Sequence, residues 1–323
     1  MRNFEYRIVE EAREAARLCA EGATLPKGGG IDLIDRMKEG LERPARLIGL
    51  HRALDATVAS TLDGTLRIGA SATLAQLAEE LAESHPSLAQ GAGEAATPQV
   101  RRMATLGGNL LQRPRCAYFR SRHYSCVKDG GEGCPAAEGL HDTHALFDNA
   151  PCSAVHPSNT APALISLGAS VRLVGADSQR ELPIAGLFVP ASADPTREDV
   201  LRPGEILTEV LVPAASRGPR AAHYEVRHKQ SFDWPLAIAA VNFNRDQAQL
   251  VLGAVASTPL AVPQAEAALR ACAADPSEAR LQAVADLAVA AATPLPGNAW
   301  RLPLVRTAVR RAILQALGLP AER

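Results

Sequence analysis

The apolar positions of the first 55 residues alternate between the period of a strand and the period of a helix. Residues 4–9 have the pattern of an extended strand, and residues 10–22 follow with helical spacing that ends at Gly22. The stretch "ATLPKGGGIDLIDRMKEGLERPARLIGL" then gives a short strand, three consecutive glycines, a second helix and a third strand. We therefore predict that residues 1–55 form a strand–helix–strand–helix–strand unit.

The remaining chain divides into a longer middle part and a C-terminal part. Residues 56–215 hold helical patterns such as "ATLAQLAEEL", an aperiodic stretch at 113–152, and strands such as "EILTEVLVP". The stretch "AASRGPR" has the composition of a linker, and a meander and three alanine-rich helices follow it. We predict that residues 216–323 form a separate α+β domain.

Composition and charge narrow the possible partners. The 323 residues are 47% hydrophobic and 21% charged, and the formal net charge is −1. These values predict a globular protein that binds neither nucleic acid nor an anionic membrane through its overall charge. We expect no direct membrane insertion, because no apolar run reaches the roughly 18 residues that a membrane span needs. No signal-peptide pattern is seen, so we expect a cytoplasmic location unless a signal-bearing partner carries the chain to the periplasm.

Two glycine runs, "KGGGIDL" (Lys27–Leu33) and "ATLGGNL" (Ala104–Leu110), are candidates for a phosphate site. Adjacent glycines let backbone N–H groups approach an anion closely, and two such runs would suit a dinucleotide. Neither run matches the G-x-G-x-x-G fingerprint or a Walker A loop, which argues against a nicotinamide Rossmann domain or a P-loop nucleotidase. A pair of tight turns is the simpler alternative.

Four of the six cysteines, Cys116, Cys126, Cys134 and Cys152, cluster in and beside the aperiodic stretch. A structural zinc site would favour Cys-x2–4-Cys pairs, which are absent here, and disulfides would require an oxidising compartment. An iron–sulfur cluster tolerates irregular spacing, so all three interpretations stay open on spacing alone. We interpret nearby His123, His141, His144 and His156 as surface residues rather than ligands, and Cys19 and Cys272 as small buried apolar residues.

Several segments together resemble the FAD-binding medium subunits of molybdenum hydroxylases, the xanthine dehydrogenase and carbon monoxide dehydrogenase superfamily. They are "GGGIDLIDRMKEGLERPARLIGL", "TPQVRRMATLGGNLLQRPRCAYFR", "HPSNTAPALISLGASVRL", "GEILTEVLVP", "YEVRHKQSFDWPLAIAAV" and "PLPGNAWRLPLVRTAVRRAIL". The resemblance covers nearly the whole chain. It implies an α+β fold: a vanillyl-alcohol-oxidase/PCMH-like FAD-binding domain of two α/β subdomains, 1–55 and 56–215, and a smaller C-terminal α+β domain, 216–323.

Within that family the chain is most similar to bacterial aldehyde oxidoreductase flavin subunits, which carry an extra [4Fe–4S] cluster. The resemblance implies that the cluster lies in the loop 113–152, with Cys116, Cys126, Cys134 and Cys152 as its ligands. The cluster would either relay electrons or hold the long loop in place.

The resemblance also implies FAD-binding residues. The first run would bind the FAD pyrophosphate through backbone amides, the second run would form a second loop on the cofactor, and Ala96 and Leu111 would line it. Asn159 stands where many members have an aspartate that contacts the adenosine half. Trp234 would lie beside the isoalloxazine ring or in the core below it. The run residues are Gly28, Gly29, Gly30, Ile31, Asp32, Leu33, Thr105, Leu106, Gly107, Gly108 and Asn109.

One departure from the family pattern falls in the first run. Ile31 replaces the usual threonine, so a hydroxyl contact is lost, while the backbone donors remain.

The implied function is electron transfer, with no catalytic residue in this chain. A molybdenum-cofactor large subunit would hydroxylate an aldehyde or a heterocycle, and a small subunit with two [2Fe–2S] clusters would pass the electrons to FAD for delivery to an external acceptor. Two alternatives are a stand-alone flavoenzyme and a zinc-bound scaffold subunit that has lost FAD.

Overall fold

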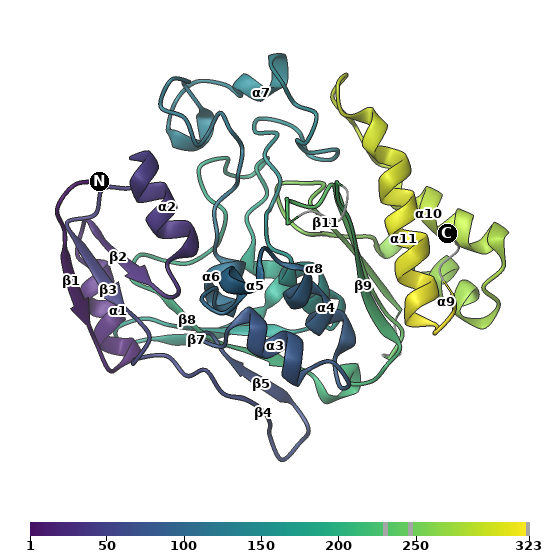
Figure 1. Ribbon diagram of the computed structural model, residues 1–323, viewed down its shortest axis with the longest axis horizontal. Helices are drawn as coiled ribbons and strands as arrows, with labels where there is room; N and C mark the ends of the chain where they lie inside the picture. The colour runs from purple at the N-terminus through teal and green to yellow at the C-terminus, as the bar shows by residue number, and fades with distance from the viewer. Residues whose placement is uncertain (229–231, 245–247, 321–323) are drawn as a thin grey trace.

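Three β-sheets, each with its own helices, make up the molecule, and a long loop stands above them (Figure 1). Figure 1 shows the three-stranded sheet at the left, the five-stranded sheet at the bottom and the four-stranded sheet at the right. The computed structural model describes residues 1–228, 232–244 and 248–320. Residues 229–231, 245–247 and 321–323, all in the predicted C-terminal domain, lie outside the described residues.

The three-stranded sheet is parallel, with strand order β1-β3-β2. Its strands are β1 (Glu5–Ile8), β2 (Thr24–Lys27) and β3 (Arg46–Gly49), joined by the helices α1 (Ala12–Ala20) and α2 (Ile31–Glu39). Parallel neighbours need a crossover connection, which is why a helix follows each of the first two strands. The central strand β3 buries Leu47 and Ile48. The predicted strand–helix–strand–helix–strand pattern is confirmed.

The five-stranded sheet is antiparallel throughout, with the order β4-β5-β8-β6-β7. The strands are β4 (Val58–Ser60), β5 (Leu66–Gly69), β6 (Ser170–Val174), β7 (Gln179–Pro183) and β8 (Ile206–Val212). Short turns join β4 to β5 and β6 to β7, so neither pair needs a crossover helix. The predicted second α/β subdomain therefore has helices and strands packed in layers rather than alternating parallel units.

Helices cover this five-stranded sheet and enclose one apolar core with it. They are α3 (Leu74–Glu80), α4 (Pro86–Glu94), α5 (Pro98–Arg101), α6 (Leu106–Leu110) and α8 (Thr160–Ser166). Threonines begin three of them: the side-chain oxygens of Thr73, Thr97 and Thr105 each accept a backbone N–H of the first turn.

The four-stranded sheet is antiparallel, with the order β12-β11-β10-β9. The strands are β9 (Ala221–Val226), β10 (Ala237–Asn242), β11 (Gln249–Gly253) and β12 (Leu260–Ala261), and the helices are α9 (Glu266–Ala274), α10 (Glu278–Val289) and α11 (Leu302–Ala316). Every residue of β10 is buried, because α11 packs on one side while α8 from the middle part packs on the other. The predicted meander and helices are confirmed for the described residues.

The loop 113–152 contains only short helical turns, among them α7 (Pro135–Glu138). Figure 1 shows it at the top, between α2 and α11. Its distal end is tied to the C-terminal part: Leu146 N–H donates to Val255 O at 2.7 Å, and Asn298 Nδ2 donates to Ala145 O at 2.9 Å. The loop therefore bridges the first and last thirds of the chain.

Candidate cofactor site

A cavity of about 640 Å³ opens where the three-stranded sheet, the five-stranded sheet and Trp234 meet. This volume is typical of small-molecule and cofactor pockets. All but one of the predicted cofactor-binding residues line it. These are Gly28, Gly29, Gly30, Ile31, Asp32, Leu33, Ala96, Thr105, Gly107, Gly108, Asn109, Leu111, Asn159 and Trp234. Leu106 is the exception: its side chain is fully buried in the core beneath the five-stranded sheet.

The first glycine run connects β2 to α2 and leaves backbone donors directed at the cavity. Gly30 is the residue before α2 and has φ of 82°, a conformation that glycine adopts without strain. The first-turn N–H groups of Ile31, Asp32 and Leu33 have no intrahelical acceptor, and the described residues offer them none. The positive end of the helix dipole adds to this local preference for an anion.

The two glycine runs touch at Gly29. A Cβ atom built there would lie 1.8 Å from the carbonyl oxygen of Met103, so no larger residue fits without backbone movement. The absence of a side chain thus allows the loop before α2 to lie directly against the segment that leads into the second run.

The second run contributes less through its amides than the sequence suggests. Leu106 N–H donates to Ala72 O, Gly107 N–H to Ala70 O and Asn109 N–H to Thr105 O, at 2.8, 3.0 and 2.8 Å. Gly108 N–H donates to Thr105 Oγ1 at 3.2 Å. The N–H groups of Leu106 and Gly107 thus bond to the segment after β5, and those of Gly108 and Asn109 bond to Thr105 at the start of α6. The second run therefore presents a close backbone surface and the Asn109 side chain to the cavity.

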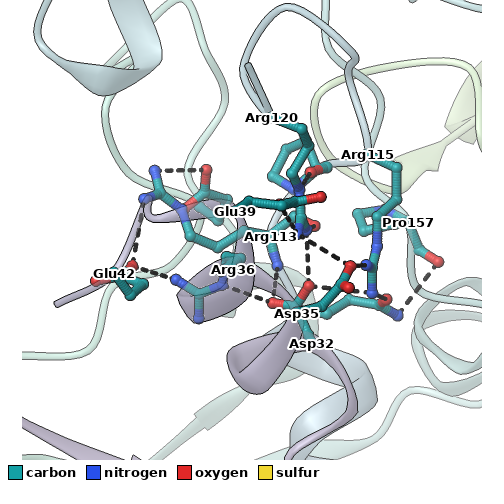
Figure 2. Close-up of polar contacts among 12 residues, drawn as sticks. Asp32, Asp35, Arg36, Glu39, Glu42, Arg113, Arg115, Arg120 and Pro157 are labelled. Carbon is teal, nitrogen blue, oxygen red and sulfur yellow. Dashed lines mark hydrogen bonds and ion pairs between the residues drawn. The ribbon is translucent and has the colours of Figure 1, made fainter. Parts of the chain in front are cut away.

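Asp32, in the first turn of α2, is surrounded by Arg36 of the same helix and by arginines from the start of the loop 113–152 (Figure 2). Its carboxylate lies 2.9 Å from Arg36 Nε, 3.0 Å from Arg115 Nη2 and 2.7 Å from Arg120 Nη2, and it accepts the Arg113 N–H at 3.2 Å. Burial alone would raise the pKa of Asp32, but the guanidinium groups of Arg36, Arg115 and Arg120 outweigh it and lower that pKa. A carboxylate near the cavity is thereby neutralised by several positive charges.

Replacing Asp32 by asparagine should cost about 3 kcal/mol of unfolding free energy at neutral pH, because the arginines around this 11% exposed side chain lose their shared counter-charge. Since the folded-state pKa is lowered, ionised Asp32 stabilises the fold above about pH 4, and that contribution is lost as the pH falls below it. Urea unfolding at several pH values should show the difference between the two proteins shrinking in acid. Asp35→Asn, on a 48% exposed side chain of the same helix, is the control and should change little. Equal losses from both variants would contradict the assignment.

The remaining predicted residues occupy the cavity walls. Ala96 has φ of 44°, unusual for a residue with a side chain, and its carbonyl accepts from Arg101 Nη1 at 2.7 Å. Trp234 is 42% exposed and stacks under Arg115, with the guanidinium carbon 4.9 Å from the ring centroid. Trp234 is therefore a rim residue rather than part of the core.

Sequence reasoning missed several polar side chains of the cavity, among them those of Lys27, Gln112 and Arg115. Lys27 comes directly before the glycines of the first run, and its Nζ donates to Gly28 O at 3.3 Å, which puts a cation beside the amide donors. Arg115 precedes Cys116, and its Nε is buried without a hydrogen-bond partner among the described residues. Gln112 Nε2 donates to Asn109 O at 3.0 Å. Their positions in the sequence, next to the two glycine runs and the first cysteine, could have identified them as candidate cavity residues.

The four clustered cysteines come together in the loop next to the cavity. Burial raises the pKa of the Cys116 thiol, and negative charge at Cys126 and Cys134 raises it further, so these sulfurs lie within electrostatic range of one another. A hydrogen bond from Cys152 lowers the pKa of Cys134 to about 5, and the same pairing raises the pKa of Cys152. All four are free thiols.

No group of three or more His, Cys, Asp or Glu side chains is arranged to hold a metal ion in the part of the chain that the structure describes. A single zinc ion needs its sulfur ligands roughly 3.8 Å apart, since Zn–S bonds are about 2.3 Å. A cubane cluster places its thiolates on the outside of a larger core, so it needs convergence at wider spacing. The described residues therefore give no geometric evidence for either kind of metal site.

The nearby histidines differ in their surroundings. His144 Nε2 lies 3.2 Å from Cys116 Sγ. His156 is buried against the Phe188 ring, and burial lowers its pKa to about 3. His141 contacts Ala136 O through Nδ1 at 3.0 Å. The expectation of surface residues is therefore wrong for His144 and His156, because both side chains are buried.

Charged side chains join the cysteine loop to the cavity side. Lys128, two residues after Cys126, donates to Glu198 Oε1 at 2.8 Å, and Arg113 Nε donates to the other oxygen of Glu198 at 2.9 Å. The Arg113 backbone N–H in turn donates to Asp32. These contacts connect Lys128, which lies two residues after Cys126, through Glu198 and Arg113 to Asp32 of α2.

Comparison with known proteins identifies relatives along the whole chain. Residues 2–215 match the family model described as the FAD binding domain in molybdopterin dehydrogenase. The chain is 32% identical over 324 residues to the aldehyde oxidoreductase FAD-binding subunit PaoB of Escherichia coli, covering 98% of this chain and 99% of that protein. It is 28% identical over 327 residues to the carbon monoxide dehydrogenase medium chain of Afipia carboxidovorans, covering 97% and 96%.

Solved structures match the fold. A crystal structure of the Cu,Mo-CO dehydrogenase superposes with a TM-score of 0.73 at 22% identity, covering 98% of both chains. Quinoline 2-oxidoreductase from Pseudomonas putida gives a TM-score of 0.72 at 19% identity, again over 98% of both chains. The predicted PCMH-like FAD-domain fold class is confirmed. None of the helices that the structure describes is long and apolar enough to cross a membrane.

Proposed function

The chain belongs to the family of FAD-binding domains of molybdopterin dehydrogenases, and from this premise we propose that it is the electron-transferring FAD subunit of a heteromeric molybdenum hydroxylase. The observation that carries the proposal is the cavity below α2. Its glycine loop leaves three helix N–H groups without acceptors among the described residues and places Lys27 beside them. These donors suit the pyrophosphate of a dinucleotide.

Residues of this chain would hold and orient the cofactor. The first run would bind the pyrophosphate, Asn109 and Asn159 would contact the polar parts of FAD, and Trp234 would lie beside the flavin ring. When bound, FAD supplies the electron chemistry, since it can take electrons singly from iron–sulfur clusters and release them in pairs to an external acceptor.

The partners of the proposed complex are a molybdenum-cofactor large subunit and a small subunit with [2Fe–2S] clusters. Curated relatives bear the names "medium chain", "FAD-binding subunit" and "dehydrogenase complex subunit alpha", which support a multi-subunit assembly. The similarity to PaoB favours an aldehyde as the substrate of the complex. The predicted limits near residues 55 and 215 remain our proposal for the three domains, supported by the location of each sheet's strands along the chain.

We also propose that Cys116, Cys126, Cys134 and Cys152 ligate a [4Fe–4S] cluster. The mutual effect of the thiols on one another's pKa values and the Cys134–Cys152 hydrogen bond support this assignment. A cluster would order an otherwise irregular loop, because ligation is coupled to folding.

The function is tested by mixing the full-length chain with a molybdenum-cofactor large subunit, a [2Fe–2S] small subunit and an aldehyde substrate. We expect flavin reduction only when the molybdenum subunit and the [2Fe–2S] subunit are both present. Reduction by the chain alone would instead support a stand-alone flavoenzyme. A colourless chain that holds stoichiometric zinc would support the scaffold alternative.

A further inference from the structure

A buried carboxylate lies behind the cavity wall, on the four-stranded sheet. Glu225 of β9 has a side chain only 1% exposed, and it contacts His223 Nε2 at 2.8 Å and Arg227 Nε at 2.9 Å. Its Oε1 also accepts a hydrogen bond from Asn159 Nδ2 at 2.7 Å. Burial alone would raise the pKa of Glu225, but His223, Arg227 and Asn159 together lower it, so the carboxylate is ionised at neutral pH.

This contact fixes the orientation of the Asn159 amide. An ionised carboxylate can only accept hydrogen bonds, so the NH2 group of Asn159 must face Glu225. The amide oxygen then points the other way, and Asn159 lines the cavity. The described residues give no hydrogen-bond donor to this Oδ1 atom.

The side-chain amide of Asn109 has the opposite orientation, with its oxygen held by the protein. Its Oδ1 accepts from Ser158 Oγ at 2.7 Å, from Thr160 Oγ1 at 2.8 Å and from Thr160 N–H at 3.3 Å. Three donors on one oxygen leave its NH2 group as the part available to the cavity, where the described residues provide no acceptor for it. Ser158 and Thr160 thus hold the side chain of Asn109, and Asn159 lies between them in the sequence.

The cavity wall therefore presents a fixed acceptor at Asn159 and a fixed donor at Asn109. A phosphate oxygen at neutral pH can use only the donor, whereas a hydroxyl can donate to one atom and accept from the other. We propose that Glu225 is a positioning residue that holds the Asn159 amide oxygen toward the cavity, where it accepts a hydrogen bond from a hydroxyl of the cofactor's ribose or ribityl chain. This inference rests on the proposed FAD-binding function.

The proposal is tested by exchanging the carboxylate of Glu225 and the amide of Asn159. The dissociation constant of FAD is measured for the full-length chain, for Glu225→Gln, for Asn159→Asp and for the double variant. Glu225→Gln should weaken binding about tenfold, because the amide of Asn159 is then free to turn its NH2 group to the cavity. Asn159→Asp should weaken it about tenfold or more, because two carboxylates then face each other.

The double variant, which combines Glu225→Gln with Asn159→Asp, should recover to within about threefold of the unmodified chain. The new amide on β9 can donate to the new carboxylate, whose second oxygen remains an acceptor for the cofactor hydroxyl. Additive losses, about 100-fold in the double variant, would overturn the proposal. If Glu225→Gln folds poorly, Asn159→Ala replaces it in the test. This variant leaves the contacts of Glu225 with His223 and Arg227 in place and should also weaken FAD binding about tenfold. Unchanged FAD binding in Asn159→Ala would also overturn it.

Glu209→Gln is the matched control. Glu209 is likewise a buried carboxylate on a strand, held by Arg67 and Arg172, but it does not line the cavity. The control should lower the unfolding midpoint and leave the FAD dissociation constant unchanged. A loss of FAD affinity equal to that of Glu225→Gln would assign the effect to general destabilisation and overturn the proposal.

Titrations with ADP and with FMN identify the hydroxyl. If Glu225→Gln weakens ADP binding alone, the contact is to the ribose of the adenosine half, and if it weakens FMN binding alone, the contact is to the ribityl chain. Loss with neither fragment would overturn the proposal. An unmodified chain that fails to bind FAD would overturn the proposed function as well, whereas FAD binding with an additive cycle would overturn this inference only.

Discussion

Replacing Gly29 by alanine is expected to weaken FAD binding by about 100-fold or more. The new Cβ atom would lie 1.8 Å from Met103 O, a distance that no pair of non-bonded atoms tolerates. Backbone must move to relieve this collision, and the movement separates the first run from the segment that leads into the second. The N–H groups at the start of α2 then lose their alignment with the pyrophosphate, which depends on position within a fraction of an ångström.

The measurement is the FAD dissociation constant of the full-length variant, with its unfolding midpoint recorded in parallel. Gly22→Ala is the control, because a Cβ atom at Gly22 meets nothing within 4 Å. It should leave both quantities unchanged. Wild-type FAD affinity in a folded Gly29→Ala protein would remove the first run from the proposed binding site.

Replacing Cys126 by serine should remove most of the iron and acid-labile sulfide from the purified protein. A hydroxyl is a poorer ligand than a thiolate for iron–sulfur clusters, and the remaining three cysteines cannot complete the set. We also expect a lower unfolding midpoint, because the loop 113–152 has little regular structure to order it without a cluster.

Cys19→Ser is the control for this experiment. Cys19 is a free, half-buried cysteine of α1. Burial is the cause that raises its pKa, and none of the four clustered cysteines contributes to that shift. It should keep the full iron content. Iron and sulfide contents that are unchanged in Cys126→Ser, or zinc in place of iron in both proteins, would contradict the cluster assignment.

The same Cys126→Ser protein, assembled with its partner subunits, separates two roles of the cluster. Flavin reduction at the normal rate with lowered stability would show that the cluster holds the loop in place. Slowed flavin reduction in a complex that still contains FAD would show that it relays electrons. The polar contacts from Lys128 through Glu198 to Arg113 give the first role a structural basis, since they connect the loop to the FAD side.

Part of the fold could be predicted from local sequence patterns. The apolar period along residues 4–49 is strong because each strand and helix buries one face against its neighbours, and it predicted the first sheet correctly. The glycine runs also located the cavity, because backbone that approaches as closely as Met103 approaches Gly29 leaves no room for a Cβ atom. At Ile31, the departure from threonine leaves the backbone donors in place, as expected.

Other features depend on contacts between distant residues and leave no local trace. The second run has adjacent glycines like the first, yet its amides are used at the start of α6 and by the segment 70–72 that follows β5. Arg113, Arg115 and Arg120 have the sequence appearance of solvated charges, but they converge on Asp32 from 81 to 88 residues away. Glu225 lies on β9, 66 residues from Asn159 at the start of α8, so its role could not be predicted from the strand pattern.

The most direct test of the central claim is the FAD content of the purified full-length chain, measured after acid release of the flavin. We expect about one FAD per chain, either as isolated or after incubation with free FAD, together with the absorption spectrum of a bound flavin. A correctly folded chain that neither contains FAD nor takes it up would contradict the account.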